Sequence, residues 1–278
     1  MIGRFLLLSS FLLVASCSSD DNEGDNEPAA ADAAIDNVAQ CAPTPGRLIV
    51  LGDSIAACAG VGGKDGATCG PKIFHGGLAS GYAPGLVYQN NAVSGAVTTN
   101  VADSQLSSVA TGPGHALVLI YVGGNDMQRY LTQADAAAEA GLRGDLPGIA
   151  QDWQSVFAFF NDTANFPDGA TIIMNNQYNP FDDCTAPPYN LSATKSSLLG
   201  EFNAKLASLA DEFDNVVLTD QHTPYLGHGH HYSVTSCPHY QAGLEPFMND
   251  LIHPNAAGHA NLAVQWNLVA DGLYRDCE

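Results

Sequence analysis

Five short apolar runs along the chain have the pattern of buried β-strands. They are nearly continuous instead of alternating apolar with polar positions, which is typical of strands covered on both faces, as in a parallel sheet. The run at 86–93 is the weakest of them, and the first run leads directly into Gly52-Asp53-Ser54. The predicted strands are 47–51, 86–93, 116–122, 170–174 and 215–219.

Between these runs lie stretches with the apolar spacing of helices. The clearest are 191–213 and 255–273, and in 191–213 large apolar side chains recur at helical intervals. The predicted helices are 100–110, 132–140, 148–161, 191–213 and 255–273. Strands that alternate with helices predict an α/β fold with a doubly wound, mostly parallel sheet. In such a fold, ligands bind beyond the carboxyl ends of the strands.

Residues 1–16 have the pattern of a secretory signal peptide. Arg4 precedes a short apolar run that is too short to span a bilayer and ends in LVASC at Cys17. This ending resembles the bacterial lipobox, whose cysteine becomes the lipidated first residue of the mature chain. An ordinary cleaved signal is the alternative. Residues 17–40 are polar and acidic and predict a disordered tether, which leaves 41–278 as the folded domain.

Composition narrows the classes of partner. The chain is 46% hydrophobic, which is enough for a sizeable core. It carries 29 acidic and 9 basic residues, and the resulting net charge of −20 argues against nucleic acid as a partner. The signal-like segment and its resemblance to a lipobox imply an exported protein of the bacterial envelope, at the outer membrane or cell surface. Its membrane contact would be a lipid anchor, and we expect a monomer.

The cysteines predict disulfides. If Cys17 carries lipid, six of the seven cysteines remain, and an even number in an exported chain is typical of disulfide bonding. Six cysteines allow 15 connectivities. We favour Cys58–Cys69 as a local clasp and Cys41–Cys277 as a link between the ends of the domain, which leaves Cys184–Cys237.

Polar residues with catalytic potential follow the predicted strands. Ser54 follows the first strand, Gly95 the second and Asn125 the third, while Asp250 and His253 follow the last. A serine hydroxyl needs a base to become a nucleophile, and imidazole can be that base near neutral pH. A carboxylate can hold the other ring nitrogen. Three donors can stabilise an oxyanion: the backbone N–H groups of Ser54 and Gly95 and the side-chain amide of Asn125.

These residues form four blocks that look like those of the SGNH (GDSL) hydrolases. The blocks are Gly52-Asp53-Ser54, Gly95, Gly123-x-Asn125-Asp126 and Asp250-x-x-His253, and their order and spacing match over about 45–265. The resemblance implies a three-layer α/β/α sandwich of the flavodoxin-like kind, with five strands. It also implies a serine esterase or lipase that needs no cofactor or metal. Residues 55–60 depart from the family pattern, which puts the shape of that loop in doubt.

A cluster of histidines raises the alternative of a metal site. Seven of the nine histidines lie between residues 222 and 259. Because no carboxylate or cysteine stands at the usual ligand spacing, we favour packing or substrate contact and expect no metal.

The sequence therefore predicts an exported, lipid-anchored ester hydrolase that acts through an acyl-enzyme. Its substrate would be a small-molecule or carbohydrate ester, and lipid or short-chain esters compete with carbohydrate O-acetyl groups. A catalytically silent surface-binding lipoprotein on the same fold is the alternative from another class.

Overall fold

The computed structural model describes residues 41–187, 189 and 191–275. The expected signal peptide, the lipidation site Cys17 and the tether lie outside the described residues, as does Cys277.

The centre of the fold is a five-stranded sheet in which every described pairing is parallel. Its order is β2-β1-β3-β4-β5, so β1 lies between the second and third strands of the chain. The chain leaves β1 toward β2 and leaves the adjacent β3 toward β4, in opposite directions across the sheet, and such a reversal is the point where open α/β sheets bind their ligands. The strands are β1 (Arg47–Gly52), β2 (Val87–Asn90), β3 (Ala116–Tyr121), β4 (Ala170–Asn175) and β5 (Val216–Thr219).

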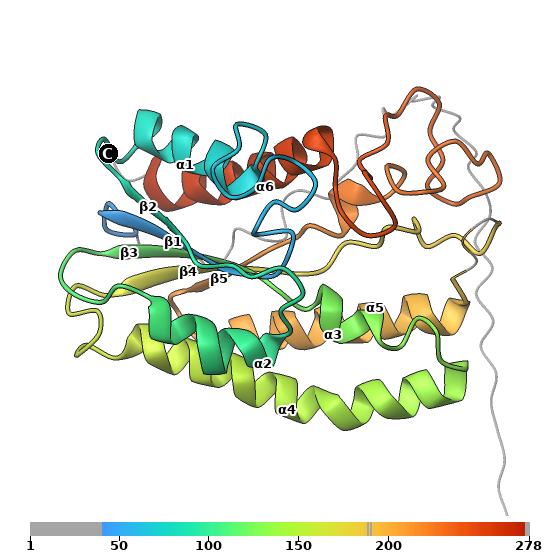
Figure 1. Cartoon of the computed structure of the whole chain (residues 1–278), viewed down its shortest axis with the longest axis horizontal. Coiled ribbons are helices and arrows are strands. Elements are labelled where there is room, and N and C mark those ends of the chain that lie inside the picture. Colours follow the sequence, from blue (N-terminus) through green and yellow to red (C-terminus); the bar gives the residue numbers. More distant parts are fainter. Residues whose placement is uncertain (1–40, 188, 190, 276–278) are drawn as a thin grey trace, which may run out of the picture. The chain divides into compact units, whose positions relative to one another are not determined.

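Helices cover both faces of the sheet, which confirms the three-layer α/β/α architecture (Figure 1). One layer holds α1 (Gly70–Gly81) and α6 (Ala256–Tyr274). The other holds α4 (Asp135–Asn161) and α5 (Ala193–Ala210). Shorter helical pieces are α2 (Thr98–Asn100), the π-helical turn Val101–Gln105, the 3₁₀ turns Leu106–Ser108 and Thr223–Tyr225, and α3 (Gly124–Gln128).

The sheet separates two apolar cores. Successive side chains of a strand point to opposite faces. In β1, Ile49 and Leu51 therefore pack with α4 and α5, whereas Leu48 and Val50 pack with α1 and α6. All four side chains are fully buried, as the continuous apolar run predicts.

The structure corrects two helix predictions. The predicted helices 132–140 and 148–161 are parts of one helix, α4, which begins at Asp135 and continues through Pro147. Proline removes one helical hydrogen bond and normally ends or kinks a helix. Here apolar side chains before and after it, including Leu142 and Trp153, are fully buried in one core, and this packing outweighs the local cost. Helix α1 was not predicted, because a segment rich in glycine is typical of a loop.

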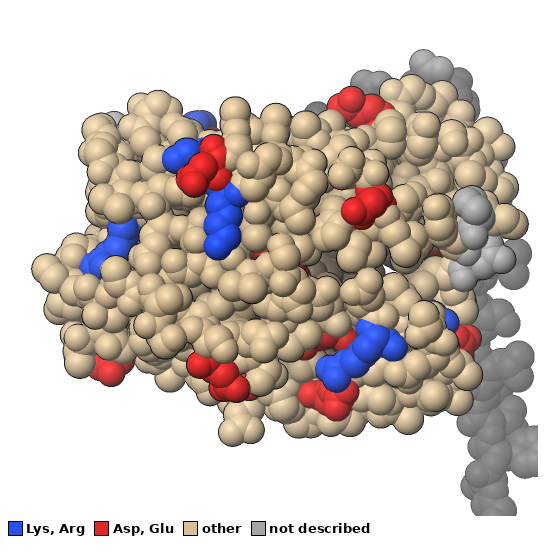
Figure 2. Space-filling view, in the orientation of Figure 1, with Lys and Arg blue, Asp and Glu red and all other residues tan. Residues whose placement is uncertain are grey.

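None of the helices in the described part of the chain combines the length and the apolar character that a membrane crossing needs. The face in Figure 2 carries few charged side chains, separated by wide uncharged areas. On this face, the described residues thus offer no continuous basic surface to a polyanion.

Candidate active site

Ser54 lies at the carboxyl end of β1, in a turn that glycine makes possible. Gly52 has a φ of +135°, and a Cβ at this position would lie 1.9 Å from the carbonyl oxygen of Tyr121. Only glycine fits such a close approach of two strands. The Gln105 side chain holds the same residue, since its Oε1 accepts from the Gly52 N–H at 2.9 Å and its Nε2 donates to the Gly52 carbonyl at 2.7 Å. The turn presents Ser54 with 7% of its surface exposed.

The structure brings Ser54, His253 and Asp250 into one hydrogen-bonded chain. The Ser54 Oγ lies 2.9 Å from Nε2 of His253. The other ring nitrogen, Nδ1, lies 2.8 Å from Oδ2 and 3.0 Å from Oδ1 of Asp250. With the proton on Nδ1, the imidazole donates to the carboxylate and leaves Nε2 free to accept the serine proton.

The Asp250 carboxylate also shapes the loop that carries the histidine. Its Oδ1 accepts the backbone N–H groups of Ile252 at 3.0 Å and His253 at 2.8 Å. Partial burial raises the pKa of Asp250, but the hydrogen bonds from Ile252 and His253 outweigh it and hold the pKa below its ordinary value. The group is therefore a carboxylate at neutral pH, as the orienting partner of an imidazole requires.

The two further oxyanion candidates come from neighbouring turns. Gly95 has a φ of +82° in an exposed turn after β2, a conformation that favours glycine. Asn125 lies in the first turn of α3 and lines the same pocket as Ser54. One hydrogen of its amide is donated to the carbonyl of Ala96 at 2.9 Å, which ties the two turns together. An amide has two such hydrogens, so the second stays available for an oxyanion.

Two buried carboxyl groups stabilise the turns around the site. Asp126 accepts from the backbone N–H of Thr98 at 3.0 Å and from its hydroxyl at 3.1 Å, which fixes the chain beyond Gly95. Burial raises the pKa of Asp126. Asp53 is 1% exposed, and its Oδ1 accepts the Ile55 N–H at 2.9 Å. Burial raises the pKa of Asp53 to about 7, and the nearby charge of Asp126 adds to the effect.

A small pocket opens beside Ser54. Its volume is about 100 Å³, well below the roughly 300–1,000 Å³ of pockets for drug-sized ligands. Its polar lining consists of Asp53, Ser54, Asn125, Gln128, Gln177, Asn179 and Lys195. Its apolar wall is formed by Ile55, Met127, Leu131, Tyr178, Pro180, Phe181, Leu191, Leu199 and Ile252. The pocket can therefore accept a small apolar group next to the serine hydroxyl.

The structure contains the Cys58–Cys69 and Cys184–Cys237 disulfides. The first closes the loop 58–69, whose beginning overlaps residues 55–60, the segment that departs from the family pattern. The pairing of Cys41 with Cys277 involves a residue outside the described part of the chain. Cys58 is also close to the buried ring of His259, whose pKa burial lowers to about 4.

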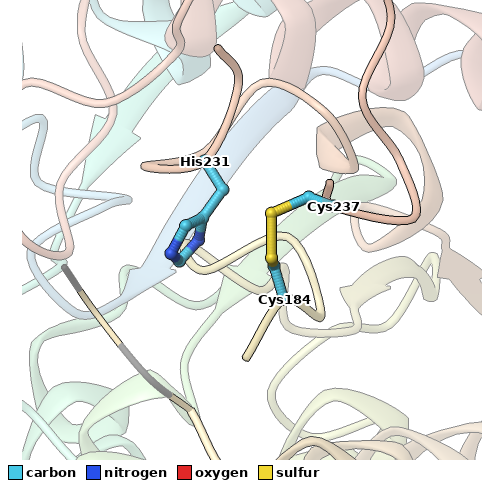
Figure 3. Close-up of side chains that lie close together, drawn as sticks. All are labelled: Cys184, His231 and Cys237. Carbon is cyan, nitrogen blue, oxygen red and sulfur yellow. A yellow bond between two sulfur atoms is a disulfide. The ribbon is translucent and has the colours of Figure 1, made fainter. Parts of the chain in front are cut away.

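One histidine of the cluster, His231, has the contacts of a packing residue. Among the described residues, Cys184, His231 and Cys237 have potential ligand atoms within 4.8 Å of one another. Figure 3 shows that His231 lies beside a sulfur–sulfur bond, so no thiolate is available to a metal. The two ring nitrogens lie 2.9 and 2.8 Å from the carbonyl oxygens of Phe181 and Ala186. While Cys184 and Cys237 form a disulfide, these three residues do not provide the ligands of a metal site.

Sequence reasoning missed two residues that shape the site. Gln105 was not singled out because a glutamine on a helix carries no local signal of its contact with a distant strand. Tyr178 was not singled out either, yet it forms part of the pocket wall and donates to the carbonyl of Ile252. Its position four residues after the end of the predicted strand 170–174 was the available signal.

The chain resembles known proteins in its sequence and in its fold. A model of the GDSL-like Lipase/Acylhydrolase family matches residues 50–260. No curated protein matches the chain. Three similar crystal structures are an extracellular lipase from Streptomyces rimosus, a phospholipase A1 from Streptomyces albidoflavus and an acetylxylan esterase from Geobacillus stearothermophilus.

These structures share the fold at low sequence identity. The lipase is 19% identical with a TM-score of 0.56, and the match covers 81% of this chain and 99% of the lipase. The phospholipase is 19% identical with a TM-score of 0.55 over the same shares of the two chains. The esterase is 18% identical with a TM-score of 0.52, over 79% of this chain and 91% of its own.

Proposed function

This chain belongs to the GDSL-like lipase/acylhydrolase family and is a carboxylic ester hydrolase, and we propose that it works through an acyl-enzyme on Ser54. The observation that carries the proposal is the chain of hydrogen bonds from the Ser54 Oγ through the His253 ring to the Asp250 carboxylate. These hydrogen bonds argue against a catalytically silent binding protein, because each of the three groups has the partner that its chemical role requires.

In the first half of the reaction, the Ser54 Oγ attacks the carbonyl carbon of the ester while Nε2 of His253 takes the hydroxyl proton. The carbonyl oxygen becomes an oxyanion. The backbone N–H groups of Ser54 and Gly95 and the free amide hydrogen of Asn125 stabilise it. The bond to the leaving oxygen then breaks, and His253 passes its proton to that oxygen, so that the alcohol leaves and the acyl group stays on Ser54.

Water completes the cycle by the same path. His253 takes a proton from a water molecule whose oxygen attacks the acyl carbon, and the oxyanion forms again at the same donors. The bond to the Ser54 Oγ breaks, and the serine regains its proton from His253. The carboxylic acid leaves, and Asp250 keeps its negative charge throughout.

The Ser54→Ala variant tests the nucleophile. It should lose the covalent label of a fluorophosphonate and lower kcat by roughly 10³-fold or more, while the fold stays intact. Ser107→Ala, at an exposed serine of the same domain, is the matched control and should keep both properties. Wild-type turnover in folded Ser54→Ala protein would refute the serine mechanism.

We propose short acyl groups as the substrate class on the acyl side. The volume of about 100 Å³ beside Ser54 suits a few carbons better than a long chain. In a series of p-nitrophenyl esters from acetate to decanoate, kcat/KM should be highest for the short members and fall as the chain lengthens. A maximum at the long members would assign the enzyme to long-chain lipids instead.

A carbohydrate O-acetyl ester is the second candidate. The Tyr189 ring lies 4.6 Å from the His230 ring and 5.9 Å from the ring of Phe181, which lines the pocket. Because Tyr189 is exposed, these rings offer an aromatic surface next to the acyl pocket on which a sugar ring can stack. Release of acetate from acetylated xylan, compared with release from ethyl acetate, separates the two candidates.

Export and lipid anchoring are proposed from the LVASC segment that ends at Cys17. The protein would then sit in the bacterial envelope, with the outer membrane or cell surface as its site. Cys17→Ala should move the enzyme from the membrane fraction to the soluble fraction without changing kcat. Unchanged membrane association would contradict the lipid anchor.

A further inference from the structure

The loop that carries His253 is exposed, so contacts on its inner side must hold it in place. The side chain of Asp250 is 53% exposed and that of His253 is 22% exposed. Position matters here, because a displacement of about 1 Å at a reacting group can cost roughly 10²-fold in rate.

The peptide group between Ile252 and His253 is held at both ends. Its N–H, which belongs to His253, donates to Oδ1 of Asp250 at 2.8 Å. Its carbonyl, which belongs to Ile252, accepts from the hydroxyl of Tyr178. A peptide group is planar and rigid, so these two bonds together fix its orientation. The carbonyl of His253 accepts from the backbone N–H of Asn249 at 2.8 Å, so the backbone is held on both sides of the His253 Cα and the direction in which its side chain leaves the backbone is fixed.

Tyr178 is itself firmly placed. It comes from the loop after β4, is 8% exposed, and stacks on the ring of Tyr225 with 4.4 Å between the ring centres and 17° between the planes. The Tyr225 hydroxyl donates to the carbonyl of Gly258 at 2.7 Å. Burial raises the pKa of Tyr178 well above its ordinary value, so its hydroxyl keeps the proton that it donates.

We propose that Tyr178 is a positioning residue for His253, an inference that rests on the proposed serine mechanism. Its hydroxyl fixes the Ile252–His253 peptide and so keeps Nε2 of the imidazole facing the Ser54 Oγ. It takes no proton from the substrate and donates none to it. The contribution is therefore a rate effect exerted through the histidine.

Tyr178→Phe tests this role with Tyr225→Phe as the matched control. Both changes keep a stacked ring and remove a hydroxyl that donates to a backbone carbonyl. They differ in position, because Gly258 lies five residues beyond His253, in the first turn of α6. The assay is steady-state hydrolysis of p-nitrophenyl acetate, with kcat counted per site that a fluorophosphonate labels, so that only folded, competent molecules contribute.

The expected result is a split between the two variants. Tyr178→Phe should lower kcat about tenfold, the factor that corresponds to one net hydrogen bond, with KM changed less than about twofold. Tyr225→Phe should keep kcat within about twofold, even where its thermal stability falls. The ratio of wild-type to Tyr178→Phe rates should stay constant between about pH 6 and 9, since a positioning group transfers no proton.

Three results would overturn the proposal. Tyr178→Phe could leave both kcat and KM unchanged, both variants could lose kcat equally, or Tyr178→Phe could raise KM and leave kcat unchanged. The second would make the tyrosine stack a general packing element, and the third would make Tyr178 a pocket wall only. Failure of the serine mechanism is seen separately, as wild-type protein that takes no label or Ser54→Ala protein that still turns over.

Discussion

The stability of an Asp53→Asn variant relative to the wild type should rise as the pH rises. The carboxyl group is buried, and its pKa is raised from 3.8 to about 7. A carboxyl whose pKa is higher in the folded state contributes its full stability below its unfolded pKa and loses that contribution as the pH rises to the folded pKa. The pKa of Asp53 is about 3 units higher in the folded than in the unfolded state. At about 1.4 kcal/mol per unit, ionisation of this group lowers the free energy of unfolding by about 4 kcal/mol.

Asparagine has nearly the same shape and carries no charge at any of these pH values. Its side-chain oxygen can still accept the Ile55 N–H, which now lies 2.9 Å from Oδ1 of Asp53. The amide nitrogen that it introduces changes stability by an amount that does not depend on pH. The stability of Asp53→Asn relative to the wild type should therefore rise by up to about 4 kcal/mol between about pH 4 and 8.

Urea unfolding with the disulfides intact, repeated across this pH range, measures the difference directly. Asp250→Asn is the control of opposite sign, because the pKa of Asp250 is lowered in the folded state. Its carboxylate stabilises the fold above its ordinary pKa and loses this effect as the pH falls, so this variant should gain nothing at high pH. A stability difference for Asp53→Asn that is flat from pH 4 to 8 would refute the reasoning.

Two further predictions concern the oxyanion and the loop clasp. Asn125→Ala should lower kcat by roughly 10²–10³-fold with little change in KM, because an oxyanion donor acts mainly in the transition state. Steady-state kinetics checks this, and a change in KM alone would make Asn125 a substrate-binding residue. Replacing Cys58 and Cys69 together with serine should lower the free energy of unfolding by about 3 kcal/mol, as expected for a short closed loop. Urea unfolding measures it, and an unchanged midpoint would contradict a stabilising clasp.

The sequence alone was enough to place the strands and the residues that follow them. A strand buried on both faces needs a continuous apolar run, so β1 and β3 are visible without any tertiary information. Because all parallel strands present their carboxyl ends at one edge, Ser54 and Asn125 could be expected to lie together. The short distance between Asp250 and His253 along the chain likewise made their contact predictable.

What the sequence could not determine depends on packing between distant segments. Helix α4 runs through Pro147 because its apolar face is buried in a core, and a local pattern cannot weigh that gain against the loss of one hydrogen bond. The contact of Tyr178 with Ile252 joins residues 74 positions apart, and the bond between Ser54 and His253 spans 199. Residue type and local spacing do not indicate which distant residues come into contact. The motifs therefore identified the catalytic residue types. The packed fold determined the position of the Ser54 hydroxyl next to the imidazole of His253.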